Sequence, residues 1–172
     1  MYSDKQIQQL HNELNKAIIK CRSVYSLWSK EHDISYNRML VLYTIREYGF
    51  CTQKQICDSY LLPRQTINNT IAKMRNEGLL EISPQNSNGK EKAFVLTDKG
   101  SKYAKRLLKS LNDVEQRTVK MVGKEKIIAM TETVLEFDNA LMKALEESAN
   151  KNSGDTIKPV NKNKNKSGNE NE

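Results

Sequence analysis

Histidine, cysteine and proline are scarce in this chain, with two, three and three copies among 172 residues. His11 and His32 have no nucleophile–base pair, metal-ligand spacing or glycine-rich phosphate loop beside them, so we expect no enzyme, metal site or cofactor. The three cysteines are odd in number and lack zinc-type spacing. They therefore argue against a disulfide framework and suit a reducing compartment.

Long apolar runs are also absent. Because the sequence has no stretch of about 18 apolar residues, we expect no membrane-spanning segment. The first ten residues, MYSDKQIQQL, lack the apolar core of a signal peptide, so we expect a cytoplasmic location. From Ser148 onward the only bulky aliphatic residues are Ile157 and Val160, too few to bury a core. We therefore predict a disordered polar tail over residues 149–172.

The net charge of +7 favours a polyanionic partner such as double-stranded DNA. This excess of positive charge is not concentrated in one segment, however. Residues 151–172 hold five lysines against three acidic residues, and residues 51–100 hold seven Lys and Arg against five Asp and Glu. Affinity for a polyanion must therefore come from where the cations lie rather than from their number.

Residues 63–77 carry an apolar stripe at helical spacing. Ile67, Ile71 and Met74 recur at steps of three and four, so one side of a helix can face a core. The other side has no carboxylate before Glu77 and carries side chains that read base edges, because Asn and Gln pair with adenine and Arg and Lys with guanine. These side chains are Arg64, Gln65, Asn68, Asn69 and Lys73.

A shorter helix is predicted just before this one. Thr52 and Gln55 have the spacing of a capping box, which marks the start of a helix. Pro63 suits the first turn of the following helix, and Gly78 marks its end. Because only residues 59–62 separate the two helices, the chain must turn sharply between them, as in a helix-turn-helix.

Beyond Gly78 the apolar period changes from helical to alternating. Leu80 and Ile82 share one face of a predicted strand, and residues 92–97 alternate in the same way. Asn88-Gly89 lies between the strands and is a strong hairpin signal, because both residues tolerate positive φ. We therefore predict a mainly α fold with a small two-stranded β wing, a winged helix-turn-helix over residues 35–100.

The order of these elements resembles the multiple antibiotic resistance regulator (MarR) family over about residues 5–148. The resemblance is carried by the strand segment GLLEIS after the second helix and above all by the wing exit, Leu96-Thr97-Asp98-Lys99-Gly100. The family's wing commonly has an Asp and Arg cluster whose arginine enters the minor groove. This sequence has Asn86, Asn88, Lys90 and Lys92 instead, so we expect a lysine contact from the wing, and the arginine role does not transfer.

These patterns give a predicted DNA-binding set. We expect Gln65, Thr66, Asn68 and Asn69 to contact bases or nearby phosphates, and Arg64 and Lys73 to contact phosphates. The full set adds the cap of the first helix and two wing lysines: Thr52, Arg64, Gln65, Thr66, Asn68, Asn69, Lys73, Lys90 and Lys92.

Long amphipathic helices flank the predicted winged domain. A heptad-like stripe runs along the first helix, residues 36–48 form a central helix capped by Ser35 and ended by Gly49, and Gly123 separates helices over about residues 99–122 and 127–145. The apolar stripes of these flanking helices are larger than the surface that one small winged domain can cover. We therefore predict a homodimer that forms through residues 1–34 and 101–148. The resemblance to the MarR family, whose members are dimers, implies the same. The stripe on the first helix contains Ile7, Leu10, Leu14, Ala17, Cys21, Val24 and Trp28.

An aromatic cluster lies where the first helix meets the second. The resemblance implies a small aromatic effector bound near this corner; plain aromatic packing is the alternative. The residues of this cluster, which we call the aromatic corner, are Tyr25, Trp28, His32 and Tyr36, with Arg38 beside them.

Cys21 resembles the redox-active cysteine of the family's peroxide sensors in lying on the first helix. Its place on the apolar stripe favours core packing instead.

The sequence thus predicts a sequence-specific transcriptional regulator, a ligand-responsive repressor that binds a pseudo-palindromic operator as a homodimer. Two alternatives stay open. One is a thiol-based redox-sensing regulator of the same fold. The other is a winged-helix protein-interaction module whose polar helix side meets a protein rather than DNA.

Overall fold

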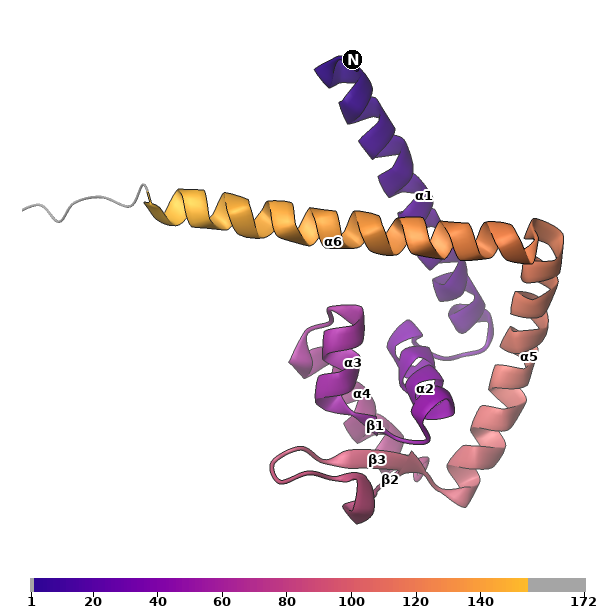
Figure 1. Cartoon of the computed structure of the whole chain (residues 1–172). Helices are drawn as coiled ribbons and strands as arrows, with labels where there is room; N and C mark the ends of the chain where they lie inside the picture. The colour runs from indigo at the N-terminus through magenta and orange to yellow at the C-terminus, as the bar shows by residue number, and fades with distance from the viewer. Residues whose placement is uncertain (1, 155–172) are drawn as a thin grey trace, which may run out of the picture. The chain divides into compact units, whose positions relative to one another are not determined.

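The computed structural model describes residues 2–154 and contains six α-helices, one 3₁₀ helix and three short strands in that range. The chain divides into two compact units, Met1–Gln116 and Arg117–Glu172. The elements follow one another as α1 (Asp4–Glu31), α2 (Tyr36–Tyr48), β1 (Cys51–Thr52), α3 (Gln53–Tyr60), α4 (Arg64–Asn76), β2 (Leu80–Ile82), η1 (Pro84–Asn86), β3 (Ala93–Leu96), α5 (Asp98–Val122) and α6 (Lys124–Gly154) (Figure 1).

The helix boundaries follow local capping chemistry. Ser35 accepts a hydrogen bond from the backbone N–H of Arg38 and begins α2, which ends before Gly49 as predicted. The predicted capping box of Thr52 and Gln55 begins α3. A capping box that the sequence analysis did not identify, formed by Ser3 and Gln6, begins α1.

The small sheet has three strands rather than the predicted two. β3 lies between β2 and β1 and pairs antiparallel with both, with Cys51 opposite Phe94 and Leu80 opposite Leu96. The two residues of β1 are too few to show alternation, which is why the sequence pattern missed this strand. Leu80 is buried as predicted, whereas Ile82 on the same predicted face is exposed at the end of β2.

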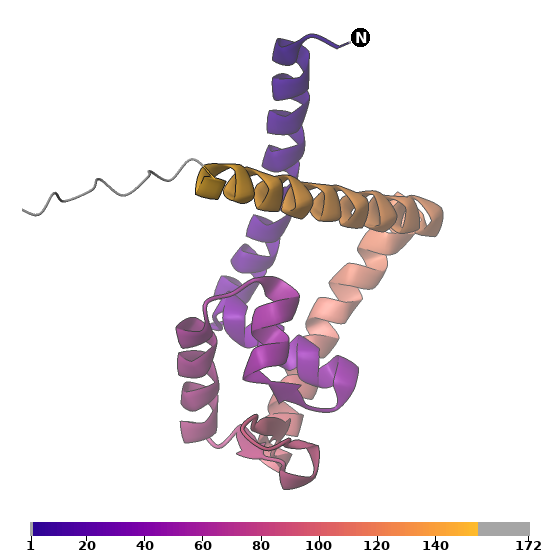
Figure 2. The same ribbon diagram turned by 60° about the vertical axis from the view of Figure 1, so that its left-hand side comes forward.

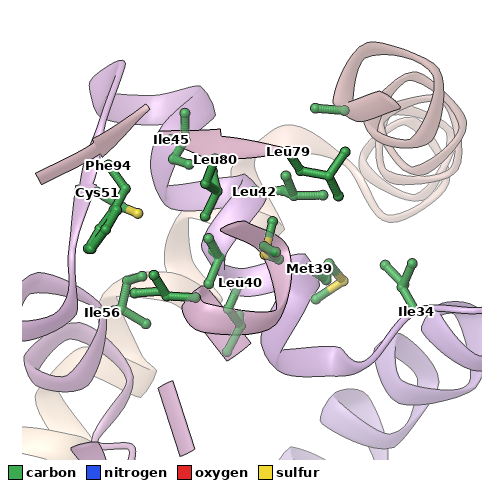
Figure 3. Close-up of a cluster of buried hydrophobic side chains, with 14 of the residues drawn as sticks. Ile34, Met39, Leu40, Leu42, Ile45, Cys51, Ile56, Leu79, Leu80 and Phe94 are labelled. Atoms are coloured by element: carbon green, nitrogen blue, oxygen red, sulfur yellow. The ribbon is translucent and has the colours of Figure 1, made fainter. Parts of the chain in front are cut away.

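The hydrophobic core of the first unit is built around α2. Its buried side chains meet Ile56 of α3 and a sheet face that includes Leu80 and Phe94 (Figure 3). α4 and α5 close the same core with apolar stripes of their own. The prediction that residues 36–48 lie in the middle of the domain is therefore confirmed. The buried residues of α2 are Met39, Leu40, Val41, Leu42, Thr44 and Ile45.

The described part of the second unit consists of the end of α5 and all of α6. α6 continues to Gly154, beyond the predicted start of the polar tail, because its polar last turns have no helix-breaking residue before Gly154. The rest of the predicted tail, residues 155–172, lies outside the described residues. Among residues 2–154, no helix combines the length and apolar content needed to cross a membrane.

The Thr97–Gly100 segment fastens the start of α5 to the turn after α4. The Thr97 hydroxyl donates to the Gly78 carbonyl over 2.7 Å and accepts from the Gly100 N–H over 3.0 Å. The Lys99 ammonium donates to the Glu77 carbonyl over 2.7 Å. A Cβ added at Gly100 would lie 2.0 Å from the Leu79 carbonyl oxygen, so only glycine permits this approach.

Gly100→Ala should therefore destabilise the first unit. The backbone must shift to accept the methyl group, and we expect a loss of about 1–3 kcal/mol in the free energy of unfolding. Urea unfolding followed by circular dichroism measures it, with Ser101→Ala, a change at the exposed neighbouring residue, as the control. Equal stability of the two variants would contradict the close approach of Gly100 to Leu79.

Candidate DNA-binding surface

α4 has one buried and one exposed side. Ile67, Ile71 and Met74 are at most 3% exposed, so the predicted apolar stripe is confirmed. The helix runs along the outer edge of the first unit (Figure 2). Its opposite side is solvent-exposed and contains the predicted polar residues, which we call the polar face of α4: Arg64, Gln65, Asn68, Asn69 and Lys73.

Two members of the polar face orient each other. The Gln65 amide nitrogen donates to the Asn69 amide oxygen over 2.8 Å, one helical turn away. Thr66, which we predicted to contact DNA, is half-buried, and its carbonyl accepts from the Thr70 hydroxyl over 2.9 Å. Asn68 is exposed beside these residues. Gln65, Asn68 and Asn69 are therefore the amides that solvent, or a duplex, can reach.

Both ends of α4 are held by neighbouring elements. At the start, the Gln53 side-chain amide donates to the Arg64 carbonyl over 2.7 Å. At the end, the Arg38 guanidinium of α2 forms an ion pair with the Glu77 carboxylate over 2.6 Å, and Lys99 binds the Glu77 carbonyl. A helix fixed at both ends presents its exposed side chains in one orientation, which a surface that recognises base edges requires.

The wing brings its two predicted lysines close to the start of α4. Asn88 and Glu91 exchange backbone hydrogen bonds across the tip, so the two turn residues are Gly89 and Lys90. Of the predicted Asn88-Gly89 pair, only Gly89 has a positive φ, +52°. A groove of about 290 Å³ opens between the wing, α3 and α4. This groove, which we call the basic groove, is lined by Gln53, Lys54, Arg64, Lys90, Glu91, Lys92 and Phe94.

Thr52 is the cap of α3 as predicted, and its contact with DNA stays a prediction. Its hydroxyl accepts from the Gln55 N–H over 3.0 Å and donates to the Glu91 carboxylate, so it is engaged within the chain. The sequence analysis missed Gln53 and Lys54, which line the basic groove. Their signal was available, because the first turn of a helix after a capping residue is where backbone N–H groups face phosphates.

The two halves of the polar face have different electrostatic surroundings. Arg64 borders the basic groove with its three lysines. Asn69 and Lys73 instead border a groove of about 360 Å³ that also contains the carboxylates of Asp33 and Glu77. A phosphate backbone is therefore attracted most strongly to the N-terminal half of α4.

The aromatic corner forms two separate contacts. The rings of Trp28 and His32 stack with centroids 4.1 Å apart, and His32 Nδ1 donates to the Trp28 carbonyl over 2.9 Å. Tyr36 instead lies under the Arg22 guanidinium at 5.3 Å. In the part of the chain that the structure describes, the buried indole N–H of Trp28 has no hydrogen-bond partner.

Tyr25 belongs to a hydrogen-bonded group on α1, α2 and α5. Its hydroxyl donates to the Glu115 carboxylate over 3.3 Å, and the Tyr43 hydroxyl donates to the same oxygen. Burial, with the nearby Glu115 carboxylate, raises the pKa of Tyr25 to about 12 and that of Tyr43 further still. Both tyrosines are therefore neutral donors at physiological pH.

The three cysteines differ in exposure. Cys51 and Cys57 are buried, and burial raises the pKa of the Cys51 thiol to about 12, so it is not a thiolate near neutral pH. Cys21 is exposed, so the expectation that it packs in a core is wrong for the single chain. The heptad stripe to which Cys21 belongs faces solvent along most of α1. Within residues 2–154, no group of His, Cys, Asp and Glu is suited to hold a metal ion.

Comparisons with known proteins agree with this geometry. Residues 34–100 match the family model described as a winged helix DNA-binding domain. A MarR family regulator from Neisseria meningitidis is 26% identical, with 86% of this chain and 98% of that chain covered and a TM-score of 0.66. No curated protein sequence matches the chain.

Two solved structures from Staphylococcus aureus share the fold. MarR in complex with salicylate and kanamycin is 15% identical, with 81% of this chain and 95% of that chain covered and a TM-score of 0.61. MepR in complex with DNA is 15% identical, with 82% and 99% covered and a TM-score of 0.56.

The helix-turn-helix, the three-stranded wing sheet and the exposed polar face of α4 define a winged helix DNA-binding protein. The chain as a whole resembles a MarR family transcriptional regulator, and its residues 34–100 form a winged helix DNA-binding domain. The resemblance found in the sequence is thus confirmed.

Asn68→Ala and Lys73→Ala should affect DNA binding differently. Loss of the Asn68 amide should cost about 1–3 kcal/mol on preferred sequences and relax the preference at one position, whereas loss of the Lys73 charge should weaken all duplexes alike and flatten the salt dependence. Fluorescence anisotropy on preferred and scrambled duplexes at several salt concentrations separates the two effects. Asn76→Ala, at the far end of α4, is the control. Equal losses on every sequence for both variants would contradict this division of roles.

Proposed function

We propose that this protein is a ligand-responsive repressor that binds a pseudo-palindromic operator as a homodimer and occupies a promoter. The observation that carries the proposal is the polar face of α4. The amide and cationic side chains of this face are exposed, and no carboxylate lies among them. The buried apolar stripe on the opposite side of the helix fixes the direction in which they point. Such a face is suited to the major groove, where Asn and Gln pair with adenine and Arg and Lys with guanine.

Exposed apolar side chains support the homodimer. α1 has four large apolar side chains that are each more than half exposed: Ile7, Leu10, Val24 and Leu27. Exposing this much apolar surface to water on one helix is unfavourable and is typical of an interaction surface. The described part of the second unit likewise exposes Met130 and Leu135 among others. A single small module buries only about 600–1,000 Å² on DNA. Two-fold symmetry places a second polar face about one helical turn away along the duplex, so the operator repeats in inverted orientation.

The dimer is tested by replacing one apolar residue of α1. Leu10→Glu should shift the protein from about twice its 19.8 kDa chain mass toward a monomer in light scattering, because a charge in an apolar interface is costly. DNA affinity should fall with it. Gln8→Glu, at an exposed polar position of the same helix, should leave the mass and the DNA affinity unchanged.

The symmetry of the operator is tested by selecting bound sites from random duplexes. The wild-type protein should select inverted repeats. A monomeric wild-type chain, or selected sites without symmetry, would overturn the proposed mode of binding.

The aromatic corner supports a small aromatic effector. The Trp28 and His32 rings stack, His32 is partly exposed, and the buried Trp28 N–H is a donor that the described chain leaves unused. The Staphylococcus aureus MarR structure is a complex with salicylate, an aromatic acid, and kanamycin. Such a ligand acts only if it binds the DNA-free arrangement more tightly than the DNA-bound one.

Salicylate should therefore bind the free protein and weaken its DNA complex. Calorimetry should give saturable binding, and anisotropy should show a lower DNA affinity as salicylate is added, because the two equilibria are linked. His32→Ala should weaken salicylate binding while leaving DNA affinity without salicylate close to wild type. His11→Ala, which removes the other histidine of the chain, is the control. Binding of salicylate without any change in DNA affinity would rule it out as an effector of this protein.

A further inference from the structure

A carboxylate lies inside the surface that the proposed function assigns to phosphates. Glu91 lines the basic groove between two wing lysines, in the segment Lys90-Glu91-Lys92. Its carboxylate accepts a hydrogen bond from the Thr52 hydroxyl at the N-terminus of α3. Wing and helix are thereby joined by a contact between residues 39 positions apart in the chain.

The cations around Glu91 outnumber it. The same groove is lined by four cations, Lys54, Arg64, Lys90 and Lys92. Lys54 forms an ion pair with the Asp58 carboxylate, outside the groove, at 2.5 Å. In the part of the chain that the structure describes, the other three form no ion pair. The groove thus keeps a positive potential that Glu91 reduces without cancelling. The hydrogen bond that Lys54 donates to the Asp58 carboxylate raises the pKa of Lys54, and Glu91 contributes in the same direction.

The place that Glu91 occupies suits a phosphate oxygen. The N-terminus of α3 offers backbone N–H groups and a positive helix dipole, which favour carboxylates and phosphates alike. The groove of about 290 Å³ is open to solvent and lies beside the exposed start of α4, where a duplex would be bound. A duplex phosphate and the Glu91 carboxylate would therefore be attracted by the same cations.

We propose that the basic groove is a binding site for a DNA backbone phosphate and that Glu91 acts there as an internal competitor in the free chain. This inference rests on the proposed DNA-binding function. Binding a duplex breaks the Glu91–Thr52 hydrogen bond or brings the carboxylate against the phosphate, and either event lowers affinity. Because phosphate contacts carry no sequence information, Glu91 weakens binding to all duplexes alike.

Glu91→Gln tests the proposal, because it removes the charge and keeps the shape of the side chain. We expect random-sequence duplex to bind about three- to tenfold more tightly to this variant, and the salt dependence to steepen by up to about 0.9 in log–log slope, the value for one phosphate. Glu81→Gln makes the same change at an exposed position of β2 outside the groove and should bind like wild type. Anisotropy with labelled duplex at several salt concentrations measures both quantities.

Each result decides the matter. Tighter binding by Glu91→Gln alone supports the competitor role. Weaker binding would mean that Glu91 only fastens the wing to α3, and a change equal to that of Glu81→Gln would mean a general charge effect; either overturns the inference while the proposed function stands. If neither wild type nor Glu91→Gln binds any duplex, both proposals fail. Circular dichroism shows whether each variant is folded. If Glu91→Gln is unfolded, Glu91→Ala takes its place in the same comparison.

Discussion

Burial of one side of α4 is the interaction on which the rest of the surface depends. Ile67, Ile71 and Met74 enter the core around α2, and this fixes which side chains of the helix meet solvent. Truncating one such residue to alanine typically costs about 2–5 kcal/mol. A whole domain is stable by only about 5–15 kcal/mol, so the apolar stripe is a large share of what keeps the polar face in place.

Apolar packing alone would leave α4 free to rotate and slide by small amounts. The contacts at its ends remove that freedom, because Arg38 holds the Glu77 carboxylate while Thr97 and Lys99 hold the Gly78 and Glu77 carbonyls. The wing-exit segment that carried the family resemblance therefore has a structural role here. It ties the end of α4 to the start of α5, and Gly100 allows its backbone to approach that of Leu79.

The sequence predicted what depends on short-range periodicity and capping. Residues a few positions apart determine the bounds of α2, the capping box at Thr52, the buried stripe of α4 and the positive φ of Gly89. Contacts over long separations were not predictable in this way. The pairing of Cys51 with Phe94, the Glu91–Thr52 hydrogen bond and the grouping of Lys54 with the wing lysines appear only when the chain is folded.

Charge placement explains how a chain with a modest positive surplus can favour one orientation on DNA. Cations gather at the start of α4 and at the wing, whereas Asp33 and Glu77 lie beside the later turns of the helix. Phosphate attraction therefore tilts the N-terminal half of α4 toward the duplex, which is the half that recognition helices use to contact bases. Gln65 and Asn68 lie in that half, whereas Asn69 borders the groove that contains Asp33 and Glu77. Electrostatic attraction and amide placement thus favour the same approach, and the Glu91 carboxylate limits the strength of the attraction without changing its direction.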